Sequence, residues 1–332
     1  MNDEKNYKIN SLQERQDLVE ETLSLIESCF GYKNPKYKFK NDFSLLFNQK
    51  NYRNLFILTE NDKVIAHIGS LPRELVFKNK KFPILMWGGI CVSPEYQGKG
   101  IFGFFFNDLQ KIIDNQYALS LLWSGLDSTY EKFHFYECGM IQQIKPLSQN
   151  KLESLNNDLS LNEKNLIIQS YQQCHQQIVT IHRTDDDWKN IWNHPSIKIF
   201  KNKDCFAFGE KGLDLQNVLY EFHPPSSVDS FKKYSKIIWN GFIKEADVSD
   251  EVLFAALVRI HPTDHFKKMI EEISNGKIKV LSIQNKTIEI AFDNQFFNIN
   301  QNEFLKGIWG PGKISEFEGL VPPLFISGID SV

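Results

Sequence analysis

The segment 90–103 constrains the fold of this chain more than any other stretch. An apolar run that ends at Val92 is broken by Pro94, and glycines at positions 98 and 100 then lead into an amphipathic helical pattern. Glycine lets the backbone approach a ligand closely, and the free N–H groups of a first helical turn, at the positive end of the helix dipole, favour a phosphate. The sequence therefore predicts a strand, a glycine-rich turn and a helix that together bind a diphosphate.

Two nucleotide-binding patterns can be compared with this turn. A Walker loop needs G-x-x-x-x-G-K-[ST], and the residues that follow Gly98 do not supply it. The dinucleotide fingerprint G-x-G-x-x-G is met literally at Gly98, Gly100 and Gly103. That fingerprint should follow a strand directly, however, and residues 93–97 intervene. Binding of NAD therefore stays open as an alternative.

A third pattern fits the turn better. Residues 92–100 are Val-Ser-Pro-Glu-Tyr-Gln-Gly-Lys-Gly. This run resembles the acyl-CoA signature of the GNAT acetyltransferases, R/Q-x-x-G-x-G/A after a strand that ends Val-x-Pro. The chain departs from the signature at Phe102, where a small residue is usual. Turn chemistry alone requires far fewer of these residue types at fixed offsets, so the match is specific.

The resemblance implies a donor and a way of holding it. The donor is acyl-CoA, with acetyl-CoA as the expected form, and no metal is expected. The diphosphate is held by the backbone of the turn, at Gln97, Gly98, Lys99, Gly100, Ile101, Phe102 and Gly103. The pantetheine amides pair like an added strand with the end of the preceding strand, at Ile90, Cys91 and Val92.

A second landmark of the same family follows the next expected strand. Residues 130–135, Tyr-Glu-Lys-Phe-His-Phe, resemble the family's Tyr-x-x-x-Gly-Phe, with His134 in place of the glycine. In the family this tyrosine is the general acid, because the collapsing intermediate expels a thiolate that a positioned phenol can protonate. The resemblance therefore assigns this role to Tyr130. A second register would place Tyr136 near the same position, but its spacing to Gly139 is one residue short.

The general base does not follow from the sequence. The attacking amine must lose a proton, and His67, Glu74 and Asp127 lie on expected strands or turns that could approach the site, with a water relay as the remaining option. Cys91 has a nucleophile interpretation. No histidine and carboxylate accompany it in the sequence, and a cysteine in a strand usually packs in the core.

The order of the expected elements predicts an α/β fold, in which a GNAT-like mixed central sheet is flanked by helices. The catalytic, acyl-CoA-binding domain is expected to span residues 1–147. Its helix after the glycines is expected to bury Phe104, Phe105, Leu109, Ile112 and Ile113. Residues 148–332 are expected to form a second α/β domain that shapes the acceptor pocket, with a hairpin over 205–221 and a helix around 230–238.

One internal repeat bears on the origin of the second domain. Leu-Trp-Ser-Gly-Leu-Asp-Ser at 122–128 recurs as Phe-Ile-Ser-Gly-Ile-Asp-Ser at 325–331, although so short a repeat does not establish a duplication. The arrangement resembles the tandem acetyltransferases of the enhanced-intracellular-survival type. Their second GNAT domain is degenerate and they add a sterol-carrier-like domain, so the segment 278–309 could belong to either. In that group the terminal carboxylate reaches the active site, which implies a catalytic role for Val332.

Composition excludes several classes of partner. The 38 basic and 41 acidic residues give a net charge of -3, so nothing attracts the chain as a whole to nucleic acid or to an anionic membrane. No apolar run is long enough to predict a membrane-spanning helix. Five widely spaced cysteines without a C-x-x-C argue against disulfides and zinc, and fit a reducing cytoplasm. The pair His261 and His265 could suggest zinc, but the residues between them fit a helix start instead.

The sequence thus predicts a cytoplasmic N-acyltransferase that moves an acetyl group from acetyl-CoA to a small-molecule or peptide amine. One alternative is a module that binds acyl-CoA without catalysis, which the departures at Phe102 and His134 keep open. The other is a NAD-dependent enzyme. The acceptor amine and the oligomeric state do not follow from the sequence.

Overall fold

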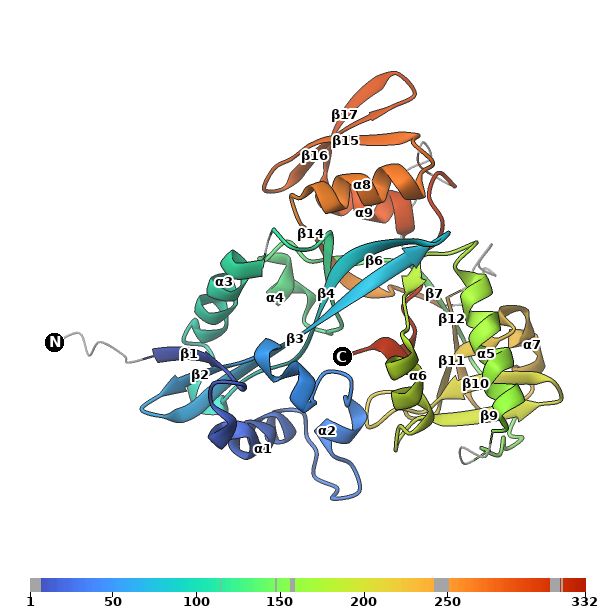
Figure 1. The fold of residues 1–332 in the computed structure, drawn as a ribbon, viewed down its shortest axis with the longest axis horizontal. Helices are drawn as coiled ribbons and strands as arrows, with labels where there is room; N and C mark the ends of the chain where they lie inside the picture. The colour runs from blue at the N-terminus through green and yellow to red at the C-terminus, as the bar shows by residue number, and fades with distance from the viewer. Residues whose placement is uncertain are drawn as a thin grey trace.

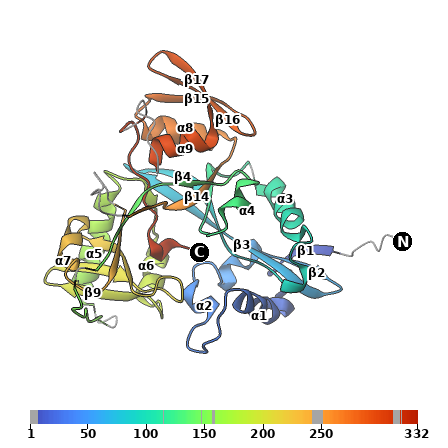
Figure 2. The ribbon, with the colours of Figure 1, turned by 180° about the vertical axis from the view of Figure 1, so that it is seen from behind.

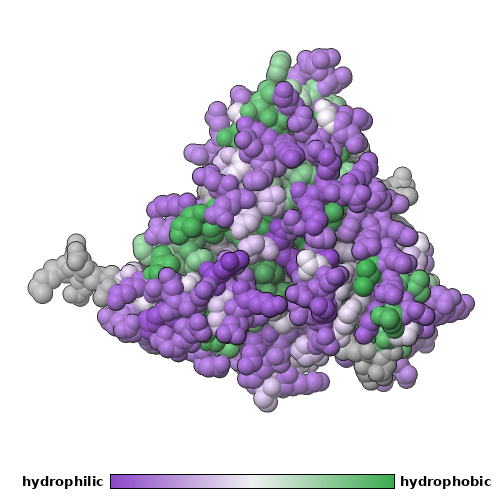
Figure 3. Space-filling model, in the orientation of Figure 1, coloured by the Kyte–Doolittle hydropathy of each residue, from purple (hydrophilic) through white to green (hydrophobic). Residues whose placement is uncertain are grey.

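The computed structural model describes residues 7–113, 115–146, 148–155, 159–241, 251–310, 317 and 319–332. In these residues helices pack on mixed β-sheets, so the predicted α/β fold is confirmed. Figures 1 and 2 show three lobes, each built on one sheet, with the C-terminus near the centre. The face drawn in Figure 3 is mainly hydrophilic with scattered hydrophobic residues, as expected when the apolar side chains are buried between the layers.

The first sheet forms the largest lobe, and only β4 and β5 pair in parallel in it. In order across the sheet, its strands are β1 (Tyr7–Ser11), β2 (Leu55–Glu60), β3 (Lys63–Phe77), β4 (Lys80–Val92), β5 (Leu119–Leu122), β14 (Ala256–Ile260) and β6 (Tyr136–Cys138), with β8 (Thr180–Ile181) paired to β3. Its helices are α1 (Val19–Cys29), α2 (Phe39–Asp42), α3 (Ile101–Ile113) and α4 (Asp127–Glu131). Neighbouring residues of β2 belong to different hydrophobic clusters, one with α1 and one with α3, so these two helices cover opposite faces.

The second sheet repeats part of this plan, with β11 and β12 as its parallel pair. Its strands in order are β13 (Glu251–Leu253), β7 (Ile141–Ile144), β12 (Ile237–Asn240), β11 (Val218–His223), β10 (Cys205–Gly209) and β9 (Lys198–Asn202). The helices that accompany it are α5 (Leu161–Cys174), α6 (Asp185–Trp192) and α7 (Val228–Phe231). The predicted hairpin over 205–221 is confirmed by the antiparallel pairing of β10 with β11. The helix expected around 230–238 is wrong, because α7 ends at Phe231 and residues 237–240 join the sheet.

The third lobe holds a small antiparallel sheet of β15 (Ile278–Ile283), β16 (Thr287–Phe292) and β17 (Gln295–Asn300). Helices α8 (Asp264–Ile273) and α9 (Gln301–Trp309) lie between this sheet and the first one (Figure 1). The buried rings of Phe266 and Phe304 contact each other at the centre of the helix pair. The segment 278–309 therefore has a sheet of its own, and its buried side chains join the hydrophobic core of the first lobe.

The two large sheets exchange strands. β7 precedes residue 147 but pairs in the second sheet, and β14 follows it but lies between β5 and β6 in the first. The predicted domains, residues 1–147 and 148–332, do not allow for this exchange of strands. The exchange joins the two lobes through main-chain hydrogen bonds.

The buried stripe of α3 differs from the prediction. Phe104 is 46% exposed and Ile112 is 65% exposed, whereas the residues that pack inward are Ile101, Phe105, Phe106, Leu109 and Ile113. The helix is apolar around most of its first turns, so the spacing alone cannot choose which face is buried.

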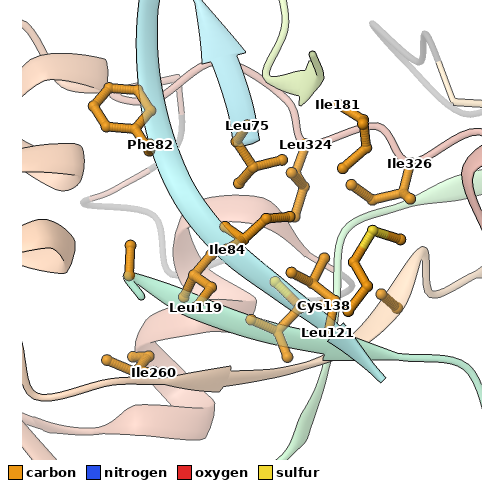
Figure 4. Close-up of a cluster of buried hydrophobic side chains, with 14 of the residues drawn as sticks. Leu75, Phe82, Ile84, Leu119, Leu121, Cys138, Ile181, Ile260, Leu324 and Ile326 are labelled. Carbon is orange, nitrogen blue, oxygen red and sulfur yellow. The ribbon is translucent and has the colours of Figure 1, made fainter. Parts of the chain in front are cut away.

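The C-terminal segment packs in the core of the first lobe. Figure 4 shows Leu324 and Ile326 beside Leu75, Ile84 and Leu121, which belong to β3, β4 and β5. Leu324 and Ile326 are almost fully buried. Because burial of such a side chain stabilises by about 1.5 to 3 kcal/mol, the tail is held as firmly as a regular element.

Candidate active site

The site begins where the parallel strands β4 and β5 separate. They pair only from Ile84 to Met86 on β4, and beyond that point no described strand pairs with this edge of β4. The separation coincides with a bulge in β4, where Gly89 has a φ of +60° and its carbonyl accepts a hydrogen bond of 2.7 Å from Nδ1–H of His67. From Trp87 to Val92 this edge therefore has no strand partner among the described residues, although the Val92 carbonyl accepts a hydrogen bond from the Gln97 side chain.

The turn after β4 presents a row of free backbone donors. Gly98 and Gly100 have φ values of +74° and +77°, and a Cβ atom placed on either would meet nothing within 4 Å. Among the described residues, no hydrogen-bond acceptor receives an N–H of residues 98–103, and the first helical bond runs from Phe104 to the carbonyl of Gly100 at 3.1 Å. Such a row of donors at a helix N-terminus suits an anion.

The side chains of the turn leave this row open. The amide of Gln97 turns back and donates to the carbonyl of Val92 at 3.0 Å, and the ammonium of Lys99 lies 5.3 Å above the ring of Tyr96. Ile101 is buried under the helix. A Cβ on Gly103 would be 3.8 Å from Phe133, in ordinary contact.

Phe102 occupies the position where the acyl-CoA signature has a small residue. Its ring packs edge-on against Tyr130 at 5.6 Å and Phe133 at 5.2 Å between centroids. The large side chain therefore turns into an aromatic cluster under the site, while the backbone N–H of Phe102 stays in the free row. This explains how the chain departs from the signature without closing the turn.

A cavity of about 620 Å³ opens beside the separated strands. Ile90, Tyr130 and Val332, three of the residues singled out in the sequence, lie together in its wall. Both copies of the internal repeat also line it, the first through residues 122–126 and the second through Phe325, Ile326, Gly328 and Ser331. Two segments about 200 residues apart in the chain thus meet at one site.

Of the two tyrosines considered as the general acid, Tyr130 lines this cavity and Tyr136 does not. Tyr130 is only 7% exposed, and burial raises the pKa of its phenol to about 12, although the Ser124 hydroxyl beside it opposes the shift. The group therefore stays protonated at neutral pH and is able to donate a proton. His134, which stands where the family pattern has glycine, has a φ of +63°, a conformation that glycine adopts more easily.

The terminal carboxylate lies against the strand edge. A Cβ on Gly88 would come within 2.3 Å of the carboxyl carbon of Val332 and 2.5 Å of its oxygen, so only glycine fits at this position of β4. Val332 is itself 9% exposed and borders the cavity. The tail thus places a carboxylate in the same cavity as the Tyr130 phenol.

Lys211 holds the C-terminal residues 328–331 in place, a role that no sequence pattern predicts. Its buried ammonium donates to the carbonyls of Gly328, Ile329 and Ser331 at 3.2, 3.1 and 2.5 Å, and to the hydroxyl of Ser331 at 3.0 Å. Burial lowers the pKa of Lys211 to about 8, while nearby acids such as Asp330 oppose the shift. The residue lies in the turn between β10 and β11, where the sequence gives no sign of a buried lysine.

A buried ionic network anchors the tail a second time. Arg183 donates to both carboxylate oxygens of Asp330, at 3.1 and 2.8 Å, and to both of Glu221, at 2.8 and 2.6 Å. Arg73 on β3 lies 3.7 Å from Asp330. Asp330 therefore links the tail to β11 of the second sheet and to β3 of the first.

His67 and Glu74, two of the side chains expected as general bases, lie away from the cavity. His67 is fully buried outside the cavity wall, and desolvation lowers its pKa to about 4. Glu74 pairs with Lys81 at 3.3 Å on another surface. Asp127 begins α4, and its side chain lies outside the described residues. His67 and Glu74 do not line the cavity, whereas the carboxylate of Val332 borders it.

Cys91 has the surroundings of a structural cysteine. A hydrogen bond with the Cys29 thiol, together with burial, raises its pKa well above the usual range. A protonated thiol is a poor nucleophile. Among the described residues no cluster of three or more His, Cys, Asp or Glu could hold a metal, and His261 bonds to the hydroxyl of Ser120 at 2.7 Å. None of the described helices has the length and apolar character that crossing a membrane requires.

Known proteins share both sequence and fold features with this chain. Residues 11–138 match the acetyltransferase (GNAT) domain family. The solved GCN5-related N-acetyltransferase from Anabaena variabilis is 14% identical, with a TM-score of 0.57 over 89% of this chain and 85% of that chain. The one from Kribbella flavida is 11% identical, with a TM-score of 0.56 over 90% and 84%.

Eis1 from Mycobacterium abscessus is also similar, at 11% identity and a TM-score of 0.53 over 89% of this chain and 85% of that chain. No curated protein sequence matches significantly. The predicted GNAT fold is therefore confirmed, and since the structural matches cover about nine-tenths of the chain, the shared fold extends past residue 138.

Proposed function

We propose that this chain, which carries a GNAT acetyltransferase domain at residues 11–138, is an N-acetyltransferase that moves an acetyl group from acetyl-CoA to an amine by direct attack. The observation that carries the proposal is the row of free N–H groups at 98–103, set beside a free strand edge that leads into the cavity. Few other ligands combine a diphosphate with a strand-like arm of amides. The five free cysteines support the expected cytoplasmic location.

In this proposal each part of the donor has a place. The diphosphate accepts hydrogen bonds from the N–H groups of residues 98–103. The pantetheine arm pairs with the edge of β4 at Ile90, Cys91 and Val92. The thioester then lies at the bulge of β4, within the cavity that Tyr130 and Val332 line.

The reaction uses the two ionisable groups of that cavity. The bound ammonium first releases one proton to solvent. The neutral amine nitrogen then attacks the thioester carbonyl carbon, forming the C–N bond, and its second proton passes to the terminal carboxylate of Val332. The tetrahedral intermediate then breaks its C–S bond. The Tyr130 phenol gives its proton to the departing thiolate, and the proton held by the carboxylate returns to tyrosine through solvent. Atoms and protons balance, and the products are an acetamide and CoA.

Calorimetric titration and a turnover assay test the proposal. CoA and acetyl-CoA are expected to bind while NAD does not, and release of the CoA thiol is expected when acetyl-CoA and a primary amine are both present. Binding of CoA without turnover of any amine would favour a sensor module instead. Binding of NAD alone would favour a dinucleotide enzyme.

A further inference from the structure

We propose that the acceptor is a hydrophobic primary amine, carrying an aromatic or aliphatic body and no anionic group. The inference rests on the proposed acyl transfer and deepens it. The inference comes from the chemistry of the cavity wall. The side chains of the wall favour some amines over others according to the groups that the amine carries besides its nitrogen.

The wall of the cavity is mainly apolar and rich in aromatic side chains. Of its lining residues, ten are aromatic: Phe30, Phe39, Phe43, Trp87, Trp123, Tyr130, Tyr220, Trp239, Phe254 and Phe325. Most of the others are aliphatic or glycine. Such a surface gains free energy by burying apolar area and by placing a cation over aromatic rings.

The charges of the wall are all negative. Apart from the phenols of Tyr130 and Tyr220, Asp214 is the one ionisable acid or base side chain among the described lining residues, and the terminal carboxylate of Val332 is the second anionic group. No lysine, arginine or histidine lines the cavity in the described part of the chain. An ammonium group thus finds partners there, while a carboxylate or phosphate finds none.

Asp214 marks the acceptor side of the cavity. Asp214 is an exposed residue that lines the cavity. Desolvation by the surrounding protein raises the pKa of its carboxyl group, the nearby Lys211 lowers it, and the nearby Asp42 raises it further. A long acyl chain in this place would leave the acid beside hydrocarbon, at a cost in desolvation. A cationic amine instead stabilises the ionised form.

The same wall disfavours the common polar amines. Amino sugars carry several hydroxyls, and the side-chain hydroxyls of the wall are few: those of Ser124, Ser331, Tyr130 and Tyr220, of which that of Ser331 is already bonded to Lys211 and to the carbonyl of Gly328. Free amino acids carry a carboxylate that would lie near Asp214 and Val332. Burying either without partners costs a few kcal/mol, which is enough to reject them.

A matched set of acceptors tests the inference with the complete chain. The set is 2-phenylethylamine, phenylalanine, which adds a carboxylate to the same body, and glucosamine. We expect kcat/KM with acetyl-CoA to be about a hundredfold higher for 2-phenylethylamine than for either of the others. If glucosamine or phenylalanine is acetylated as fast, the inference is wrong and the acyl transfer stands. If no amine is acetylated, the transfer itself is wrong and the inference falls with it.

A pair of variants locates the cation site. Asp214→Asn is expected to raise KM for 2-phenylethylamine about tenfold, since an ion pair in a partly buried site is lost, while kcat and the affinity for CoA stay unchanged. Asp204→Asn, at the exposed turn between β9 and β10, is the matched control and should alter none of them. An unchanged KM in Asp214→Asn, or a fall in CoA affinity, would contradict the assignment of Asp214 to the acceptor.

Discussion

The two strand–helix–strand crossovers of this chain have the same plan and opposite consequences. In the first, β4 leads through α3 to the parallel strand β5; in the second, β11 leads through α7 to the parallel strand β12. Both begin with a short 3-10 turn in which a proline stands first, at Pro94 and Pro225. The repeated topology supports the proposal that the second lobe is a degenerate copy of the first.

The difference lies in the residues of the turn and the length of the helix. The first crossover has two glycines at positive φ and a helix of 13 residues, so its N–H groups stay free at a strong dipole. The second has no glycine between β11 and α7, and α7 has 4 residues. Under the proposed function, the turn of the first crossover binds the diphosphate, and the second crossover keeps the topology without those free donors. The second lobe supplies part of the cavity wall instead, through Asp214, Leu215, Tyr220 and Trp239.

The largest expected effect comes from closing the first turn. Gly100→Val should weaken the binding of CoA by about a hundredfold or more, because β-branched residues resist a φ of +77° and the side chain stands where the diphosphate approaches. Calorimetry measures the affinity. Gly276→Val is the matched control, since Gly276 has a φ of +76° in open space far from the turn. Equal affinities for CoA in Gly100→Val and Gly276→Val would contradict the assignment of the diphosphate to the turn of the first crossover.

The next effect concerns the proton donor beside the first crossover. Tyr130→Phe should lower kcat about a hundredfold, since general acid catalysis contributes at least that much, and leave CoA affinity unchanged. Tyr234→Phe, in the second crossover, should keep full turnover. The wild-type kcat should also show no alkaline loss due to Tyr130 below about pH 11, because the pKa of the phenol is raised to about 12. Loss of turnover in both variants, or in neither, would contradict the role.

A smaller effect is expected at the tail, where the second lobe acts on the first. Lys211→Met removes the donor that fixes the carbonyls of residues 328, 329 and 331, and should lower kcat about tenfold through misplacement of the Val332 carboxylate. CoA affinity should remain, because the free N–H row is untouched. Lys203→Met at an exposed turn is the control. A kcat that survives both Lys211→Met and an added C-terminal Gly-Ser would exclude the tail from the mechanism.

The smallest effect is a loss of stability in acid. His67 is neutral in the folded chain with a pKa lowered to about 4, whereas unfolded histidine titrates near 6.5. As the pH falls, the unfolded state therefore binds the proton first. This protonation stabilises the unfolded state and lowers the free energy of unfolding by about 1 kcal/mol between pH 6.5 and 5.5. Urea unfolding midpoints measure this loss. It should shrink in His67→Gln and persist in His265→Gln, which replaces an exposed histidine; an identical loss in both variants would contradict the assignment.

Local features of the site could be predicted from the sequence, and long-range ones could not. The turn at 97–103 and Tyr130 follow from residues close together in the chain, and the structure packs the ring of Phe102 against that of Tyr130 at the cavity wall. Lys211 and Asp330 act through partners more than a hundred residues away, so no spacing shows them. The exchange of β7 and β14 is hidden for the same reason.

The incorrect predictions for α3 and β3 also have physical causes. Phe104 and Ile112 were expected in the core because α3 is apolar on more than one face, and packing against β3 and β4 chooses the other side. His67 and Glu74 were considered as bases because they lie on a strand near the site. Which face of β3 each side chain points from depends on the register with β4, and a bulge at Gly89 shifts that register.

A crystal structure of the chain with CoA bound tests the central claim most directly. The account predicts diphosphate oxygens within about 3 Å of the N–H groups of residues 98–103, and no ligand at the turn that precedes α7. A diphosphate bound elsewhere, or those N–H groups turned inward and bonded to the protein, would contradict it.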